Sequence, residues 1–368
     1  MIYKDGNINE LIAYADGKKL VCYGAGQYLR RLCDVFAPFD FAGRIDYVAD
    51  TYAEKIGDVY NYGDTVKPLG TLERFLKENP GEFVLVITSF LFSDILTDLQ
   101  SQESFSNIVC YIGAFLEQQP PTYSLPVFNP DTDRLIIPKV LHYCWFGDSP
   151  IPQQHKKHME SWRKFCPDYE IIEWNEKNYD VTQNRYMREA YQAKKWGFVP
   201  DYARLDIIYR YGGVYLDTDV ELIKPIDRFL CVPGFCGMHN AGMVQPGSAF
   251  GAVQDHEMIQ IMRSIYELSS FINEDGTLNL TTSTKYQTDV LIMHGLKSSN
   301  TMQKIHDMVI YPSDVFSPIN AEYLVDRITE NTHGIHHFAS SWLDNERLNE
   351  KSARKEQAQE FLKRVEKK

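Results

Sequence analysis

The stretch FVPDYARLDIIYRYGGVYLDTDVELIKP, residues 198–225, decides the fold of the longer part of this chain. Asp201–Arg210 has the character of a helix, and the glycine pair that follows Tyr211 predicts where the helix ends and the chain turns. Val214–Leu222 then alternates apolar and polar residues, which predicts one strand with a core face and an acidic face. The stretch therefore predicts a helix, a tight turn and a strand in direct succession.

The acidic face of that strand would carry Tyr215, Asp217 and Asp219 on one side. Two neighbouring aspartates repel each other unless a positive charge lies between them. Because Mg²⁺ and Mn²⁺ prefer oxygen ligands, Asp217 and Asp219 are candidate metal ligands. Asp201 and Arg204 are three positions apart, so they share one face of the preceding helix. The alternative is a solvated edge strand with ordinary surface acids, since a bare D-x-D occurs often by chance.

Strand-like and helix-like segments also alternate through residues 1–116, which predicts a parallel sheet covered by helices on both faces. Residues 117–137 are rich in proline and predict a linker between two domains. A second α/β domain is expected over 138–343, followed by a charged helix over 344–368. In the first domain we expect strands in KKLVCY, GRIDYVAD, EFVLVITS and NIVCYIG, and helices in QYLRRLCDVF, TLERFLKEN and FSDILTDLQ.

Composition excludes several classes of protein. The chain has 368 residues and a formal net charge of −12, so a general nucleic-acid binder, which needs a basic face, is not expected. The 7 cysteines include no C-x-x-C pair, which argues against a disulfide framework or a zinc knuckle. The N-terminus lacks the pattern of a signal peptide, and no apolar stretch is long enough to span a bilayer. We therefore expect a cytoplasmic protein, with placement at the inner face of a membrane as an alternative.

The loop Gly24-Ala25-Gly26 of the first domain follows a strand and opens a helix, where backbone N–H groups can hold a phosphate. Asp50 ends the next strand, at the position that would meet a ribose hydroxyl. The third glycine of the dinucleotide fingerprint is replaced by Leu29, which hinders close packing of helix on strand. Three interpretations stay open: a tight turn with a degenerate site, a nucleotide or nucleotide-sugar site, and NAD binding. The segment loosely resembles small Rossmann-like domains of bacterial polysaccharide-assembly proteins.

The acidic segment and three others together resemble glycosyltransferase family 32. DYARLDIIYRYGGVYLDTDV is similar to the sugar-nucleotide motif of that family, which also recurs in the large clostridial glucosylating toxins. IPKVLHYCWFG (137–147) resembles its opening strand, WRKFCPDYEIIEWNE (162–176) its second strand unit, and IHHFASSW (335–342) its closing motif. The resemblance covers residues 137–343 in the right order. It implies an α/β fold of the GT-A type with a metal-dependent nucleotide-sugar site.

The resemblance also assigns roles to residues of this chain. The acidic pair would bind Mn²⁺ or Mg²⁺, and Asp201 with Arg204 would hold the donor sugar and its phosphates. Trp145 would stack on the nucleobase. The catalytic set implied is Asp201, Arg204, Asp217 and Asp219. The nucleotide-sugar-binding set implied is His142, Trp145, Asp201, Arg204, Tyr215, Asp217, Ser341 and Trp342.

His336 and His337 are candidate metal ligands beside Asp217 and Asp219, because a histidine in the closing motif completes the metal shell in related retaining enzymes. Consecutive residues of a strand point to opposite faces, so we expect only one of the two to face the metal, with a slight preference for His336. The alternative is that both are packing residues.

The function expected from the resemblance is retaining transfer of a hexose from a nucleotide-sugar, most simply a UDP-sugar, to a glycan of bacterial capsule or surface polysaccharide. No residue pair identifies the nucleophile of a double displacement, which favours front-face transfer. The alternatives are a toxin-like glycosyltransferase that modifies proteins, a non-catalytic nucleotide-sugar-binding regulator, and an NAD-dependent sugar oxidoreductase. The acceptor pocket, around 236–252, matches the family only loosely, so the acceptor is not predicted.

A lipid-linked acceptor is one alternative that bears on the C-terminal segment 344–368. Its apolar residues Phe361, Leu362 and Val365 would form a short stripe on a charged helix. Such a helix is either a solvated terminus or a weak anchor on an anionic membrane. Peripheral membrane association therefore stays open.

Overall fold

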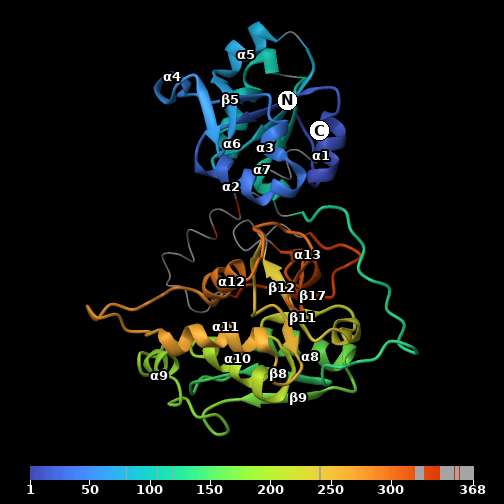
Figure 1. Ribbon diagram of the computed structural model, residues 1–368, viewed down its shortest axis with the longest axis vertical. Coiled ribbons are helices and arrows are strands. Elements are labelled where there is room, and N and C mark those ends of the chain that lie inside the picture. Colours follow the sequence, from blue (N-terminus) through green and yellow to red (C-terminus); the bar gives the residue numbers. More distant parts are fainter. Residues whose placement is uncertain are drawn as a thin grey trace. The chain divides into compact units, whose positions relative to one another are not determined.

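The structure is a computed structural model that describes the chain except for residues 80, 106, 118, 240–241, 320–326, 340–351, 353–355 and 357–368. The chain divides into two compact units (Figure 1). Met1–Tyr123 make up most of the first, and Ser124–Lys297 with Thr301–Ser352 make up the second. The division after Tyr123 falls inside the proline-rich segment 117–137. The expected terminal helix over 344–368 lies almost entirely outside the described residues.

The first unit is built on a seven-stranded sheet with the order β1-β7-β6-β2-β3-β5-β4. All neighbours pair in parallel except β4 and β5, which form an antiparallel hairpin. The strands are β1 (Ile2–Tyr3), β2 (Lys19–Tyr23), β3 (Tyr47–Ala49), β4 (Val59–Tyr62), β5 (Thr65–Gly70), β6 (Phe83–Ile87) and β7 (Val109–Ile112). The helices are α1 (Ile8–Ala15), α2 (Gln27–Val35), α3 (Phe41–Arg44), α4 (Ala53–Ile56), α5 (Leu72–Glu78), α6 (Phe92–Gln100) and α7 (Gly113–Leu116), with 3₁₀ turns at Ala37–Phe39 and Glu103–Phe105.

The second unit has a mixed eight-stranded sheet with the order β15-β16-β12-β14-β10-β8-β9, and β13 pairs with β12. Its members are β8 (Val140–Cys144), β9 (Glu170–Trp174), β10 (Gly213–Tyr215), β12 (Gly234–His239), β13 (Met243–Val244), β14 (Phe250–Ala252), β15 (Gln303–Ile305) and β16 (Met308–Tyr311). Strands β9, β8 and β10 run parallel, and β14 is antiparallel to both of its neighbours. A separate two-stranded sheet pairs β11 (Val220–Leu222) with β17 (Gly334–His336).

Helices surround this sheet, and some of them enclose an apolar core with it. They are α8 (Gln153–Phe165), α9 (Arg185–Gln192), α10 (Pro200–Tyr211), α11 (Glu257–Leu268), α12 (Ser283–Met293) and α13 (Ser313–Phe316), with a 3₁₀ turn at Asp227–Cys231. Helix α10 packs against α9, α11 and β8 (Figure 1). Both units thus confirm the predicted fold class, an α/β protein whose small, mostly parallel sheet precedes a larger one.

Helix α10 is buried along nearly its whole length, which explains its sequence. Pro200 begins it, where the missing N–H costs nothing, and Gly212 ends it with φ 67°. Asp201, Arg204 and Asp206 are buried together with the apolar residues between them. A helix with charges inside a core needs partners for them, and these partners build the site described below.

Gly213 follows at the start of β10 with φ 97°, a backbone conformation that disfavours every residue with a Cβ. A Cβ at this position would lie 2.8 Å from the carbonyl oxygen of Val140 and 2.9 Å from Nε2 of His142. The glycine pair therefore serves both the turn and the close approach of β10 to β8.

We expect Gly213→Ala to lower the free energy of unfolding by about 3 kcal/mol, because it adds a backbone clash to the cost of positive φ. Gly276→Ala is the matched control, since Gly276 has φ 82° but nothing within 4 Å of its Cβ position. That control should cost only about 1 kcal/mol. Urea denaturation of the two variants measures the difference, and equal losses would show that the contact with Val140 is unimportant.

Candidate active site

The two aspartates of the D-x-D motif lie in a turn and not on a strand. The prediction of one continuous strand over Val214–Leu222 is wrong: β10 ends at Tyr215 and β11 begins at Val220. The N–H of Val220 donates to the carbonyl of Asp217 over 3.0 Å, which closes the turn. The chain leaves the large sheet here and enters the small sheet formed with β17. Asp217 and Asp219 therefore do not share one face of a strand, and each has its own partners.

Asp217 is paired with Arg204 of α10. The Nη2 of Arg204 lies 3.5 Å from Oδ1 of Asp217 and 3.3 Å from Oδ1 of Asp201. The hydroxyl of Tyr215 donates to Asp217 Oδ1 over 3.0 Å, and its ring centroid lies 5.1 Å from the guanidinium carbon of Arg204. Arg204 and Asp201 are buried, while the side chain of Asp217 is 27% exposed. One guanidinium thus holds two carboxylates, of which only that of Asp217 reaches solvent.

Burial sets the protonation of Asp201. It raises the pKa of this carboxyl to about 7, although the charge of Arg204 acts in the opposite direction. The charge of Asp217 adds to the increase, and a hydrogen bond with Ser283 reduces it. Near neutral pH, Asp201 is therefore partly neutral, and Arg204 keeps positive charge that is not fully compensated.

Asp219 is paired with His336 at the end of β17. The Nε2 of His336 lies 3.2 Å from Oδ1 of Asp219, and the N–H of Ala339 donates to Oδ2 over 2.9 Å. Burial alone would raise the pKa of Asp219, but His336 and the Ala339 N–H outweigh it, so the pKa is lowered. Burial likewise opposes the charged form of His336, yet Asp219 raises the pKa of the imidazole. Among the described residues, Nδ1 of His336 is a buried nitrogen with no hydrogen-bond partner.

Asp217, Asp219 and His336 form a group that can hold a divalent metal. One ligand atom from each lies within 4.8 Å of the others. Two carboxylates and one imidazole suit Mn²⁺, which accepts nitrogen and oxygen ligands, better than Mg²⁺, which prefers oxygen. His337 does not join this group: it points to the opposite face of β17, where it contacts Glu221. Of the two histidines, the structure therefore places only His336 with the aspartates.

Trp145 and His142 occupy different surroundings. The half-buried Trp145 makes an edge contact with His155 at 5.9 Å between ring centroids, and His155 Nδ1 lies 2.8 Å from the hydroxyl of Thr218 between the two aspartates. A nucleobase on Trp145 would thus be near the metal ligands.

His142 is buried, with Nδ1 accepting from the Trp174 indole and Nε2 on the carbonyl of Gly212. Burial lowers its pKa to about 4. Because both ring nitrogens are used by the protein, His142 supports the turn after α10 and is not assigned to the donor. Ser341 and Trp342 lie outside the described residues.

Two residues of this site were not predicted from the sequence. The carbonyl of Gly247 accepts from the N–H of Asp217 over 2.9 Å, and a Cβ on Gly247 would lie 2.1 Å from Oδ2 of Asp217. Ser283, the first residue of α12, contributes the hydrogen bond to Asp201. The only signal for Gly247 was its place in the poorly matched segment 236–252. No local pattern distinguishes Ser283.

A carboxylate of the first unit binds one N–H of the glycine loop. Oδ2 of Asp50 accepts from the N–H of Ala25 over 2.8 Å, and Oδ1 accepts from the N–H of Tyr52 over 2.8 Å. The carboxylate that would meet a ribose hydroxyl thus binds the loop itself. The bond favours a tight turn over an open dinucleotide site, while α2 begins at Gly26 without a side-chain cap, so the nucleotide alternative stays open.

Residues 152–233 match the family described as "Glycosyltransferase sugar-binding region containing DXD motif". This segment resembles the sugar-binding region of DXD glycosyltransferases. It contains α10, the turn with both aspartates and β11, so the predicted resemblance to glycosyltransferase family 32 is confirmed for these residues. His336, the partner of Asp219, lies beyond the matched segment.

Inositol phosphoceramide mannosyltransferase 1 of Schizosaccharomyces pombe is 29% identical over 168 residues, covering 42% of this chain and 50% of the relative. The chain spans half or less of the length of this relative and of inositol phosphoceramide mannosyltransferases 2 and 3 of the same organism. Among solved structures, the PaToxG glycosyltransferase matches 43% of this chain and 68% of its own at 15% identity and a TM-score of 0.32. A glycosyltransferase involved in glycosylation of the major capsid of PBCV-1 matches 60% and 98% at 12% identity and a TM-score of 0.34.

In the part of the chain that the structure describes, none of the helices combines the length and the apolar character needed to cross a bilayer.

The raised pKa of Asp201 predicts a pH-dependent stability. Because the folded chain binds this proton more tightly than the unfolded chain, the free energy of unfolding should fall as pH rises from about 4 to about 7. Asp201→Asn removes this contribution, so wild type should lose stability relative to the variant across that range. Urea denaturation at several pH values measures the difference.

Asp275→Asn is the matched control for this experiment. Hydrogen bonds from Thr277 lower the pKa of the exposed Asp275, so its wild-type-minus-variant difference should change only below about pH 4 and stay constant between about pH 4 and about pH 7. If wild type instead gains stability over Asp201→Asn with rising pH, the ion pair with Arg204 outweighs burial.

Proposed function

We propose that this protein is a metal-dependent, retaining glycosyltransferase that transfers a hexose from a nucleotide-sugar to a glycan acceptor. The observation that carries the proposal is the convergence of Asp217, Asp219 and His336 beside Arg204, where all but His336 belong to the segment that matches the DXD glycosyltransferase family. A buried arginine paired with the partly exposed Asp217 suits stabilisation of a leaving group better than binding alone. The proposed metal is Mn²⁺, with Mg²⁺ as the second choice.

The residues of the chain would share the work of stabilising the leaving group. Asp217, Asp219 and His336 would hold the metal, which as a Lewis acid would neutralise charge developing on the diphosphate. Arg204 provides a fixed positive charge that needs no reorganisation during the reaction. Tyr215 holds Asp217 through a hydrogen bond, and Asp201 holds the guanidinium of Arg204 through an ion pair. Trp145 would carry the base of the donor, with uridine as the expected base.

We propose front-face transfer for the chemical step. The acceptor hydroxyl attacks the anomeric carbon on the side from which the diphosphate leaves, the C–O bond to phosphate breaks, and the hydroxyl proton passes to the leaving phosphate oxygen. The transition state has oxocarbenium character, and retention follows from attack on the same face. This step asks for no carboxylate nucleophile, and the described carboxylates near the turn are already paired with Arg204 and His336.

For the acceptor, we propose a glycan of surface polysaccharide, with lipid-linked glycans included because the fission-yeast relative is named for an inositol phosphoceramide. The same name makes mannose a donor sugar to test beside glucose and galactose. We place the reaction on the cytoplasmic side, at the inner face of the membrane if the acceptor carries a lipid.

Nucleotide release from a panel of UDP- and GDP-hexoses with Mn²⁺ tests the proposal. We expect turnover with one donor, and a loss of 100-fold or more in kcat/KM for Asp217→Asn and Asp219→Asn, because each removes a charge that stabilises the leaving group. Asp275→Asn, on an exposed turn, is the control that should keep full activity.

Two results would contradict this function. Release of nucleotide from none of the donors, or unchanged release in both aspartate variants, would remove the enzymatic proposal. A product with inverted anomeric configuration, read by NMR, would remove the retaining step while leaving transfer intact.

A further inference from the structure

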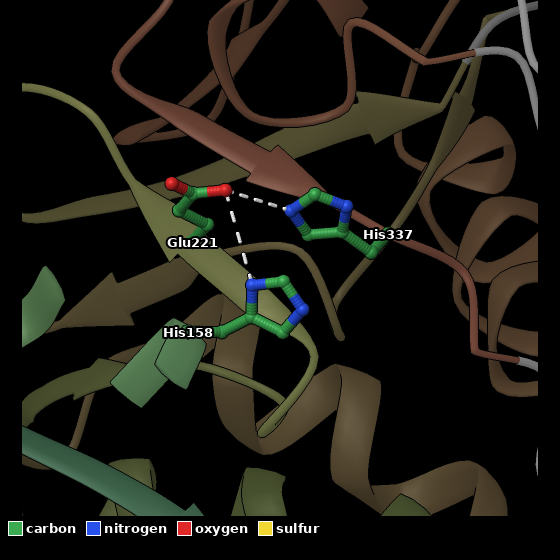
Figure 2. A group of neighbouring side chains, drawn as sticks. All are labelled: His158, Glu221 and His337. Carbon is green, nitrogen blue, oxygen red and sulfur yellow. Dashed lines mark hydrogen bonds and ion pairs between the residues drawn. The ribbon is translucent and has the colours of Figure 1, made fainter. Parts of the chain in front are cut away.

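A second cluster of metal-ligating side chains lies on the other face of the small sheet. His158 comes from α8, Glu221 from β11, and His337 directly follows β17 (Figure 2). Nε2 of His337 lies 3.0 Å and Nδ1 of His158 3.8 Å from the same oxygen, Oε2 of Glu221. One ligand atom from each residue lies within 4.8 Å of the others. Three segments distant in sequence therefore direct two imidazoles at one carboxylate.

Hydrogen bonding explains only half of this arrangement. The distance from His337 to Glu221 suits a hydrogen bond, but that from His158 is too long for one. The two imidazole rings also stack, with centroids 4.0 Å apart and planes at 24°. Two stacked imidazoles that each turn a ring nitrogen toward one carboxylate oxygen are arranged as a set of metal ligands.

The second ring nitrogen of His158, Nε2, contacts a side chain of its own helix. Nε2 lies 3.3 Å from the side-chain amide of Gln154, one turn earlier on α8. In the structure the facing atom is the amide nitrogen, Nε2 of Gln154. Exchanging the amide oxygen and nitrogen would let His158 Nε2–H donate to Gln154 and leave Nδ1 free to ligate, the outer-sphere support usual for metal-bound histidine. The His158 side chain is only 6% exposed, whereas His337 and Glu221 are 32% and 39% exposed. Water can therefore enter from one side.

We propose that His158, Glu221 and His337 bind a zinc ion at a site separate from the one formed by Asp217, Asp219 and His336. Two imidazoles and one carboxylate with a water molecule make the four-coordinate set that Zn²⁺ favours. The first group contains two carboxylates and one imidazole, a harder set. The two sites differ in chemistry although His336 and His337 are consecutive residues.

The zinc site would position the first group without contacting the donor. The N–H of His337 donates to the carbonyl of Asp219 over 3.0 Å, and His336 pairs with the carboxylate of Asp219. A metal that ties His337 to α8 and β11 therefore fixes the chain segment that presents Asp219 and His336. This inference does not rest on the proposed function, because zinc binding is measured without any sugar.

Cobalt provides the test, since Co²⁺ replaces Zn²⁺ and absorbs strongly in the visible only at four-coordinate sites. The full-length protein, stripped with EDTA, should bind one equivalent of Co²⁺ with strong visible absorption, which Zn²⁺ then displaces. Glu221→Gln, His158→Ala and His337→Ala should each abolish this absorption. His155→Ala, on the same helix as His158, and Asp217→Asn should keep it.

Thermal unfolding gives a second readout. Saturating Zn²⁺ should raise the Tm of the stripped wild-type protein by roughly 5 °C and leave that of Glu221→Gln unchanged. Glu221→Gln preserves side-chain shape, and circular dichroism in EDTA checks that it folds.

The proposal is overturned if the cobalt absorption survives all three ligand variants or is lost in His306→Ala. His306 lies 3.3 Å from His294 in an exposed histidine pair, which is the competing site for a surface-bound ion. Loss of zinc binding together with normal nucleotide release would remove only this proposal. Zinc binding without any donor turnover would remove only the proposed function.

Discussion

The pairing of Arg204 with Asp201 and Asp217 is the constraint on which the site depends. A buried guanidinium is costly to desolvate, so it needs carboxylate partners within a few ångströms. Asp201 satisfies it from the same helix, and Asp217 satisfies it from the turn after β10. Arg204 therefore holds the first D-x-D aspartate against the core helix while leaving one side of that aspartate open to solvent. Replacing these three residues by apolar ones would keep a core but remove the ion pair that holds the turn after β10 against α10.

The small sheet of β11 and β17 then sorts the remaining ligands into two groups. Its strands are antiparallel, with Val220 opposite His336. Because consecutive side chains leave a strand on opposite faces, His336 meets Asp219 on one face and His337 meets Glu221 on the other. The step from His336 to His337 thus separates a group with two carboxylates from a group with two imidazoles. The two share main-chain bonds, and any change in the closing segment affects both.

Sequence patterns predicted much of this molecule because its signals are local. Buried apolar runs such as EFVLVITS, the glycine pair after Tyr211 and the three-residue spacing of Asp201 and Arg204 act within one element, and the structure has the corresponding strand, turn and shared helix face. The break at Asp217–Asp219 was missed because alternation continues through it; the chain changes sheets there for a tertiary reason, the pairing of β11 with β17. His158 and Gly247 were missed because their roles arise only when distant segments meet.

The pairing of β11 with β17 also determines when the site can exist during synthesis. Glu221 and His337 are 116 positions apart, and Asp219 and Ala339 are 120 apart. Contacts with such sequence separation form late, because the intervening chain must first be ordered. The D-x-D turn is translated before β17, so Asp219 lacks its partner His336 until that strand has been made. A nascent chain with only the matched segment 152–233 therefore has both aspartates but lacks His336, and the proposed metal group is complete only when the second unit is whole.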